Sequence, residues 1–378
     1  NSRWGGSSRI HLRLRGSEPS PGADPGLGHY ALASVELRTH ESIRDVGEQI
    51  WNGLGGSGSP MLSFSWLDAL ETTGCVGPER GWLPMHVTIE DAGRVVAAAP
   101  VYVKGNSEGE FVFDHAWASH AEGRLGIDYY PKIVVAVPFT PATGPRLLVS
   151  AGADRELVTR AFAQGLGALT ERIGASSAHV LFPPGDEADL LEAAGMARRA
   201  GLQFHWENAG YASFDDFLGG FSSKKRHQLR RERREAASEG LVFESLLGKE
   251  LSSARIDAVY ELYLTTVDKF VWGRRYLNRD FFHEVCSKLG ESVQVVLASA
   301  SGGAPIAGAF NLLGDDTLYG RYWGAHQERR FLHFEVCYYR GIDECIARGL
   351  ARFEPGAGGE HKAARGFLPT LTHSVHFL

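Results

Sequence analysis

The spacing of apolar residues predicts alternating helices and strands from about Ala31 onward. Apolar residues that recur every three or four positions indicate amphipathic helices, and short apolar runs bounded by turn residues indicate strands. The first half has expected helices at 40–52, 62–72, 154–173 and 186–195, and expected strands at 82–90, 94–104, 110–114, 131–137, 145–149, 178–182 and 202–208. Asp154 is a suitable N-cap for the helix expected at 154–173, although Gly165 and Gly167 weaken the prediction of this helix. The tripeptide "DAG" at 91–93 predicts a tight hairpin turn.

A second, similar series starts near Ser213. It has expected helices at 222–238, 253–270, 278–289 and 331–350, and expected strands at 241–247, 292–300, 304–313, 316–325, 352–357 and 372–378. Ser222 or Ser223 can cap the first of these helices, and Gly240 is a stop signal. The stretches 91–105 and 300–314 each place a Gly turn before an apolar strand. This weak internal repeat suggests two copies of one α/β unit.

The predicted organisation is therefore two α/β domains with a boundary near 208–213. The N-terminal domain is expected at 31–210 and the C-terminal domain at 211–378. Residues 1–30 are rich in Gly, Ser, Pro and Arg and lack the apolar core of a secretory signal. They are expected to be a disordered lead or a vector-derived remnant.

Composition narrows the class of protein. The net charge of −6 argues against general nucleic-acid coating or a membrane-adherent surface, so anion binding has to be local. Cys75, Cys286, Cys337 and Cys345 form no CxxC pair, which predicts reduced, buried thiols and no zinc site. No apolar run approaches the roughly 20 residues of a membrane span. A cytoplasmic protein without a DNA partner, a metal or a tightly bound cofactor is expected.

One short segment of this acidic chain is strongly basic. Seven Lys or Arg residues lie between Lys224 and Arg234, inside the predicted helix 222–238. One interpretation is a solvated helix face paired with Glu232 and Glu235. The excess of cations favours a second interpretation, a clamp on the phosphates of a donor molecule. Its expected phosphate-binding residues are Lys224, Lys225, Arg230, Arg231 and Arg234.

The loop "EPGAGGEHKAARG" (354–366) is a second candidate site. Gly356, Gly358 and Gly359 permit positive φ and close approach of the backbone to a ligand. Glu354 or His361 is available as a general base. Glu360, Lys362 and Arg365 are expected to contact substrate. The two cations among them would hold a carboxylate or phosphate. The alternative is a loop tied down by its own ion pairs.

Two further segments carry candidate residues. In the strand "DTLYGRYWGA", Arg321 and Trp323 are expected to share a face and to bind substrate, with Tyr322 as a proton donor. His333, a candidate base, and Glu335 begin the next helix. Around the start of the strand at 131–137 lie the substrate-binding candidates Asp128, Tyr129, Tyr130 and Lys132. Strand packing, helix capping and a structural turn are the alternatives.

Other chemistries fit poorly, because the sequence has no GxSxG, HExxH or GxxxxGK[ST] motif. Four stretches instead resemble one family. They are "DYYPKIVVAVPFTPATGPRLL" (128–148), "SSKKRHQLRRERREA" (222–236), "LYGRYWGAHQERRFLHFEVCYY" (318–339) and "RFEPGAGGEHKAARGF" (352–367). Together they resemble the FemAB-like proteins of the GNAT superfamily, bacterial proteins associated with peptidoglycan biosynthesis or recognition.

The resemblance implies tandem GNAT-like domains, each a mixed, largely antiparallel sheet flanked by helices. It also implies direct transfer of an acyl or aminoacyl group to an amine, in a cleft between the domains. Ordinary GNAT enzymes use acyl-CoA, and the best-known Fem proteins use aminoacyl-tRNA. The glycine-rich pyrophosphate motif of acyl-CoA enzymes is missing, since "AHQERRFLHFE" has no glycine after Gly324.

Three functions remain open at this point. The first, which the sequence favours, is an acyl-CoA-dependent N-acyltransferase with a small-molecule or peptide amine as acceptor. The second is an aminoacyl-tRNA-dependent ligase acting on a cell-wall precursor or peptide. The third is a non-catalytic protein that binds a cell-wall fragment.

Overall fold

The computed structural model describes residues 8–12, 35–56, 58–238, 240–269, 274–300 and 303–378, which form two compact units. Unit 1 contains residues up to Ser57, Leu62–Gly201 and Thr372–Leu378, and unit 2 contains Gly58–Met61 and Leu202–Leu371. The chain passes from unit 1 to unit 2 within β10 (Ala197–Glu207) and returns within β16 (Leu368–Phe377). The last seven residues, expected in the C-terminal domain, therefore group with the first unit.

Unit 1 contains two sheets. An antiparallel sheet has the order β1-β2-β4-β5-β8, and a mixed sheet has the order β16-β9-β7-β6-β3, in which β7 and β9 are parallel. The strands are β1 (Arg9–Leu12), β2 (Val35–His40), β3 (Trp82–Pro84), β4 (His86–Asp91), β5 (Arg94–Ala99), β6 (Val101–Lys104), β7 (Lys132–Val135), β8 (Leu148–Val149) and β9 (Ala178–Leu181). The helices are α1 (Ile43–Val46), α2 (Glu48–Trp51), α3 (Phe64–Thr72), α4 (His115–His120), α5 (Arg155–Ile173) and α6 (Gly185–Ala193), with shorter turns η1 (Asn52–Gly56), η2 (Pro60–Leu62), η3 (Pro78–Arg80) and η4 (Ala121–Leu125).

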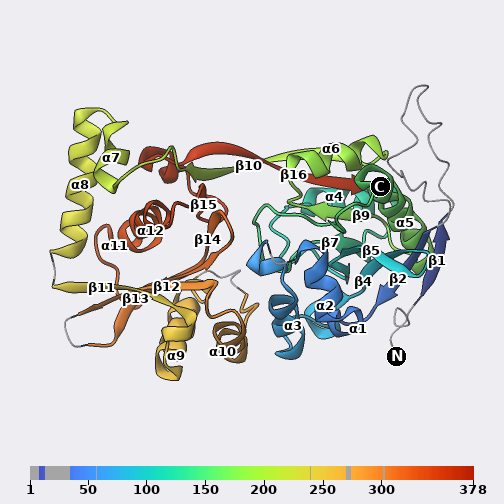
Figure 1. Ribbon diagram of the computed structural model, residues 1–378, viewed down its shortest axis with the longest axis horizontal. Coiled ribbons are helices and arrows are strands. Elements are labelled where there is room, and N and C mark those ends of the chain that lie inside the picture. Colours follow the sequence, from blue (N-terminus) through green and yellow to red (C-terminus); the bar gives the residue numbers. More distant parts are fainter. Residues whose placement is uncertain (1–7, 13–34, 57, 239, 270–273, 301–302) are drawn as a thin grey trace. The chain divides into compact units, whose positions relative to one another are not determined.

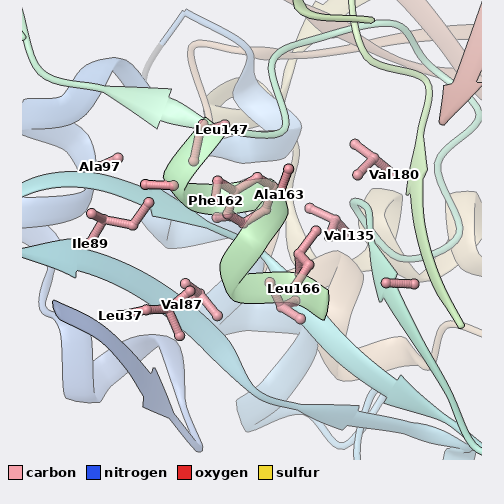
Figure 2. Packing of buried hydrophobic residues seen from close by; sticks show 14 of the residues in the cluster. Leu37, Val87, Ile89, Ala97, Val135, Leu147, Phe162, Ala163, Leu166 and Val180 are labelled. Carbon is pink, nitrogen blue, oxygen red and sulfur yellow. The ribbon is translucent and has the colours of Figure 1, made fainter. Parts of the chain in front are cut away.

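The core of unit 1 forms around α5. Phe162, Ala163 and Leu166 of this helix pack among Leu37, Val87, Ile89, Ala97, Val135, Leu147 and Val180 of the strands and loops (Figure 2). Asp154 caps the helix by accepting from Leu157 N at 3.0 Å. A Cβ at Gly165 would lie 2.3 Å from Leu37 Cδ1, so glycine allows the helix to lie close to β2.

Unit 2 is one sheet with helices on both faces. Its strand order is β11-β12-β13-β14-β15-β10, and β14 and β15 are the parallel pair. The helices α9 and α10 lie on one face of β12 and β13, and α11 and α12 on the other (Figure 1). The strands are β11 (Leu241–Leu247), β12 (Val293–Ala300), β13 (Pro305–Leu313), β14 (Thr317–Ala325) and β15 (Arg352–Glu354). The helices are α7 (Phe214–Gly219), α8 (Ser223–Ala237), α9 (Ser253–Val267), α10 (Arg279–Lys288), α11 (Leu332–Phe334) and α12 (Arg340–Arg348), with the turns η5 (Gly248–Glu250), η6 (Glu335–Tyr339) and η7 (Glu360–Arg365).

Several local predictions are correct because turn and cap residues fix them. Ala92 (φ 49°) and Gly93 (φ 78°) make the predicted β4–β5 hairpin turn. Ser222 caps α8 by accepting from Lys225 N. The fold class is also as predicted, since each unit is a mixed, mostly antiparallel arrangement flanked by helices.

Other local predictions are wrong. Arg9–Leu12, inside the expected disordered lead, forms β1 on β2, because Leu12 and half-buried Ile10 alternate with exposed residues. Apart from Ser8, the rest of residues 1–30 lies outside the described ranges. Residues 110–114 form no strand. Gly47 (φ 89°) divides the helix expected at 40–52. The helix expected at 331–350 contains a π-helical segment, η6, between α11 and α12.

Candidate functional site

The parallel pair in unit 2 is short, because β15 has only three residues. β14 pairs with β15 from Thr317 to Tyr319, and its remaining residues have no β15 partner among the described pairings. A bulge interrupts β14, because Phe310 pairs with Tyr322 and Asn311 with Gly320, which leaves Arg321 as the extra residue. The alternation that put Arg321 and Trp323 on one face therefore does not run unbroken through this point.

The two aromatic candidates of β14 face different helices. Tyr322 packs against Tyr263 of α9 and Phe282 of α10, with ring centroids 5.3 and 6.1 Å apart. Trp323 packs against His333 of α11 at 4.8 Å. Tyr322 also lines an apolar pocket under α9, whose other lining residues are Val259, Leu262, Tyr263, Val295, Gly308, Ala309, Phe310, Trp323 and Gly324. The proton-donor candidate Tyr322 thus contacts α9 and α10, while the base candidate His333 is part of α11, on the opposite face of the sheet.

The loop after β15 lies against β14 at Gly320. A Cβ built on Gly320 of β14 would lie 3.1 Å from Pro355 Cα, so the loop backbone runs directly beside the strand. Gly356, Gly358 and Gly359 have φ of 87°, 73° and 85°, which L-residues rarely adopt. These glycines were predicted to let the backbone come close to a ligand. In the structure they let the loop turn so that its backbone lies against β14.

The turn η7 brings two of the predicted bases together. The ring of His361 lies 6.0 Å from that of His333, and His361 Nε2 is 2.9 Å from the hydroxyl of Tyr338. Burial, with the nearby His361, Lys362 and Arg365, lowers the pKa of His333 to about 4. Burial, Arg365 and Lys362 also lower the pKa of His361. Both imidazoles are therefore neutral at neutral pH, and His361 is exposed to solvent. Sequence reasoning missed Tyr338.

The cations of this loop are occupied by the protein itself. Arg365, only 6% exposed, donates to Glu232 Oε2 at 2.9 Å and lies over the ring of Phe334. Lys362, 3% exposed, donates to the carbonyl oxygen of Gly356 at 2.6 Å. Both cations are buried and bonded to other groups of the protein, so neither is accessible to hold a carboxylate or phosphate as predicted. The alternative of a loop tied down by its own ion pairs does not describe them either, since Arg365 pairs with α8 and Lys362 bonds to a carbonyl oxygen.

The other acidic candidates differ in exposure. Glu354 is buried at the end of β15, 3.9 Å from His205 Nδ1. Glu360 is exposed at the start of η7. Glu335 is buried and accepts from Arg233 of α8 at 3.1 Å and from Arg340 at 2.9 Å. The carboxylate of Glu335 therefore connects helices, which leaves it poorly placed to contact substrate.

The helix α8 has two different faces. Leu229, Glu232 and Ala236 are buried, and Glu232 accepts from Arg365. The exposed cations on the outer face are Lys224, Arg230, Arg231 and Arg234, which we call the outer basic face. Lys225 lies instead on the inner side of the helix, near Glu232 and Arg365; it bonds to Gln228 at 3.2 Å, and burial lowers its pKa.

Few acids neutralise the outer basic face. Arg230 pairs with the exposed Asp215 at 2.9 Å, and Glu235 is shared between Arg231 at 3.4 Å and Arg330 at 3.1 Å. Lys224 and Arg234 form no ion pair with any described residue. Four cations on one helix, with Arg330 beside them, thus present a surface on which anions can bind.

Unit 1 places its predicted residues in a buried charge cluster. Lys132 is fully buried and donates to Glu110 Oε2 at 2.8 Å, to Ser107 Oγ at 2.9 Å and to Asp114. The hydroxyl of Tyr129 donates to Asp114 at 2.7 Å. Tyr130 bonds to Ser107 at 2.8 Å, while Asp128 is exposed. Lys132 is therefore shielded from any substrate in solution.

The acids of this cluster were missed because residues 110–114, "EFVFD", were interpreted as a strand. A second fully buried cation, Lys104, lies 3.9 Å from Glu110. Burial lowers the pKa of Lys104 to about 7 and raises that of Glu110 to about 7. Burial also opposes ionisation of Asp114, but Lys132 outweighs it and lowers the pKa of Asp114 to about 2. Two predicted strands that each carry a lysine, with two acids between them in the sequence, were the available signal.

The described residues contain no group of three or more His, Cys, Asp or Glu side chains arranged to hold a metal ion. The four cysteines are free thiols. Within the described ranges, none of the helices combines the length and apolar character needed to span a bilayer.

A family model for peptidoglycan biosynthesis/recognition proteins, FemAB-like, matches residues 42–378. The chain belongs to the FemAB-like family. This confirms the resemblance drawn from the four sequence stretches. No curated protein matches the chain.

Solved structures share the fold of this FemAB-like chain. The structure of FemX is 12% identical with a TM-score of 0.51, covering 89% of this chain and 96% of FemX. A C-terminal domain assigned to a lysylphosphatidylglycerol synthetase of Agrobacterium fabrum is 11% identical with a TM-score of 0.52, covering 86% and 91%. A Bacteroides thetaiotaomicron protein of unknown function is 11% identical with a TM-score of 0.53, covering 89% and 98%. At these identities the likeness shows the fold alone, and family membership supports a transferase role.

Proposed function

We propose that this protein transfers an aminoacyl or acyl group from a phosphate-bearing donor to an amine, and that the donor's phosphates bind the outer basic face of α8. The observation that carries the proposal is that face itself, four exposed cations on a chain with net charge −6. The amine attacks the donor carbonyl directly in its unprotonated form, because an ammonium has no lone pair. The family description favours a cell-wall precursor or peptide as the amine.

The geometry favours aminoacyl-tRNA over acyl-CoA as the donor. Lys224 to Arg234 spans ten helical steps, or about 15 Å of helix, a length suited to several phosphates along a nucleic-acid backbone. Where the pairing of β14 with β15 ends, the backbone of Pro355–Gly356 lies against Gly320, which leaves no room for an acyl-CoA arm beside that residue. An aminoacyl ester sits directly on its ribose and requires no such arm.

Binding measurements test the donor assignment. We expect total tRNA to bind, with affinity falling as salt rises, and the variant Arg230→Gln/Arg231→Gln/Arg234→Gln to bind at least 10-fold more weakly. The slope of log K against log salt should fall by about 0.7 to 0.9 for each phosphate that the variant no longer neutralises. The control variant, Lys249→Gln/Lys288→Gln/Arg348→Gln, removes three cations from other elements of unit 2 and should bind like the wild type.

Turnover separates the remaining alternatives. Aminoacylated tRNA with an amine acceptor should yield an amide, and ribonuclease should abolish the reaction. Product from a purified thioester in the absence of RNA would establish acyl-CoA as the donor and reject our choice. Binding of cell-wall fragments without turnover of either donor would identify a non-catalytic protein.

A further inference from the structure

The contact between Tyr338 and His361 determines where the imidazole carries its hydrogen. The phenol oxygen lies 2.9 Å from His361 Nε2, and Tyr338 is 3% exposed. Within the described part of the chain, His361 is the hydrogen-bond partner found for this hydroxyl. Burial raises the pKa of Tyr338, so the phenol keeps its proton. A buried hydroxyl that keeps its proton needs an acceptor for it.

The acceptor is therefore the lone pair of His361 Nε2. A neutral imidazole has one N–H and one acceptor nitrogen, so accepting at Nε2 puts the hydrogen on Nδ1. The donated hydrogen bond also stabilises the neutral ring over its protonated form. The charged groups around it act in the same direction, since Lys362 and Arg365 lie on the same turn and lower the pKa of His361 after burial itself. His333, the titratable group on α11, is itself neutral at neutral pH.

We propose that His361 serves the transfer reaction as a neutral hydrogen-bond donor, through Nδ1–H, to the donor carbonyl oxygen, with Tyr338 as its positioning residue. This inference rests on the proposed function and replaces the prediction that His361 is a general base. An Nε2 lone pair that already accepts from Tyr338 has no capacity to take a proton from the amine. The other ring nitrogen of this exposed residue then carries an N–H, which suits an oxygen that becomes negative.

The reaction balances without a change in His361. The amine nitrogen forms a bond to the carbonyl carbon, and the carbonyl π electrons move to the oxygen, where Nδ1–H donates. The carbon–oxygen bond to the ribose then breaks, and the proton lost by the amine ends on the ribose hydroxyl. The products are an amide and a free ribose hydroxyl, and the imidazole retains its hydrogen throughout.

The tautomer can be measured without any substrate. We expect long-range ¹H–¹⁵N spectra of histidine-labelled protein at pH 7 to show His361, assigned with His361→Asn, with its hydrogen on Nδ1. Tyr338→Phe removes the donor, so the hydrogen should shift toward Nε2 and the pKa of His361 should rise. Tyr319→Phe, a second buried tyrosine in unit 2, is the control and should change neither. A hydrogen on Nε2 in the wild type, or no response to Tyr338→Phe, would overturn the proposal.

Kinetics with aminoacylated total tRNA and a lysine-containing peptide test the role of the N–H. His361→Ala should lower kcat about 10²-fold or more with little change in KM, as for loss of an oxyanion donor. His361→Asn places an N–H near the position of Nδ1 and should recover part of kcat, whereas an essential base would be lost equally in both variants. Equal loss in Ala and Asn would therefore reject the donor role. No turnover in the wild type, with the Nδ1–H tautomer present, would count against the proposed function and leave the tautomer established.

Discussion

Each unit contains a buried cluster of ion pairs, and the two clusters differ in their chemistry. The cluster in unit 1 uses lysines, with Lys104 and Lys132 beside Glu110 and Asp114. The cluster around α8 in unit 2 uses arginines, of which Arg365 pairs with Glu232. A guanidinium stays charged in a protein, while a buried ammonium can lose its proton. The charge of the buried cation is thus permanent in the arginine cluster of unit 2 and sensitive to pH in the lysine cluster of unit 1.

The hydrogen bonds to the buried carboxylates also differ between the two clusters. In unit 2, Arg233 donates to Glu335 and Asp343 at once, at 2.6 to 3.1 Å, using its planar fork. In unit 1, Lys132 contacts two carboxylates as a single point charge, and one oxygen of Asp114 has no hydrogen-bond partner among the described residues. The lysine cluster is therefore the less completely satisfied of the two, and its members should respond more strongly to substitution.

The largest expected effect is that of Lys132→Met. It leaves Glu110 and Asp114 buried without their main partner, and breaking a buried ion pair in this way costs about 3 to 5 kcal/mol. Urea unfolding, with hydrogen exchange to localise the destabilisation in unit 1, measures it. Adding Glu110→Gln and Asp114→Asn should restore much of the free energy of unfolding. A decrease below about 1 kcal/mol for the single variant would show that the cluster is not an ionic one.

A smaller decrease is expected for Arg233→Met in unit 2. The side chain is 22% exposed, and Arg340 remains on Glu335, so we expect a decrease of about 1 to 2 kcal/mol in the free energy of unfolding. Arg230→Met on the outer face of the same helix is the matched control, because its partner Asp215 is exposed, and it should stay within about 0.5 kcal/mol of the wild type. Similar decreases for the two variants would remove the distinction between the faces of α8.

The smallest effect is the pH dependence of the Lys104–Glu110 pair. Between pH 4.5 and 7, Glu110 ionises in the unfolded chain before it does in the folded protein, so its contribution to stability falls as pH rises. Between pH 7 and 10.5, Lys104 loses its proton in the folded protein first, so stability rises with pH. The difference in free energy of unfolding between the wild type and Lys104→Met/Glu110→Gln should therefore pass through a minimum near pH 7, with a change of about 1 kcal/mol on each side. A difference that stays flat from pH 5.5 to 9 would contradict these pKa shifts.

What the sequence predicted well is what neighbouring residues decide. The caps at Asp154 and Ser222 and the turn at Ala92–Gly93 depend on backbone preferences within a few positions. The fold class followed from apolar spacing and from the family resemblance. Single residues that break an otherwise regular pattern, such as the bulge at Arg321 and the π-helical segment η6, leave no clear mark on that spacing.

The candidate site was harder to predict, because its contacts join residues far apart in the chain. The sequence identified His333 and His361, but the partner that fixes the latter, Tyr338, looked like one more core aromatic. Arg365 and Lys362 were interpreted as ligand-binding cations, since nothing local shows that Glu232, 133 positions earlier, accepts from Arg365. Charge in a sequence shows the need for a counter-charge, and only the fold shows whether the protein supplies it.

The return of the chain through β16 affects how the protein can be assembled and altered. Val375 is completely buried in the core of unit 1, and His376 lies opposite His179 of β9. During synthesis, every residue of unit 2 is made before Thr372–Leu378, so unit 1 is begun first and completed last. Removing Thr372–Leu378 would accordingly damage the fold of unit 1, most of which lies at the opposite end of the sequence.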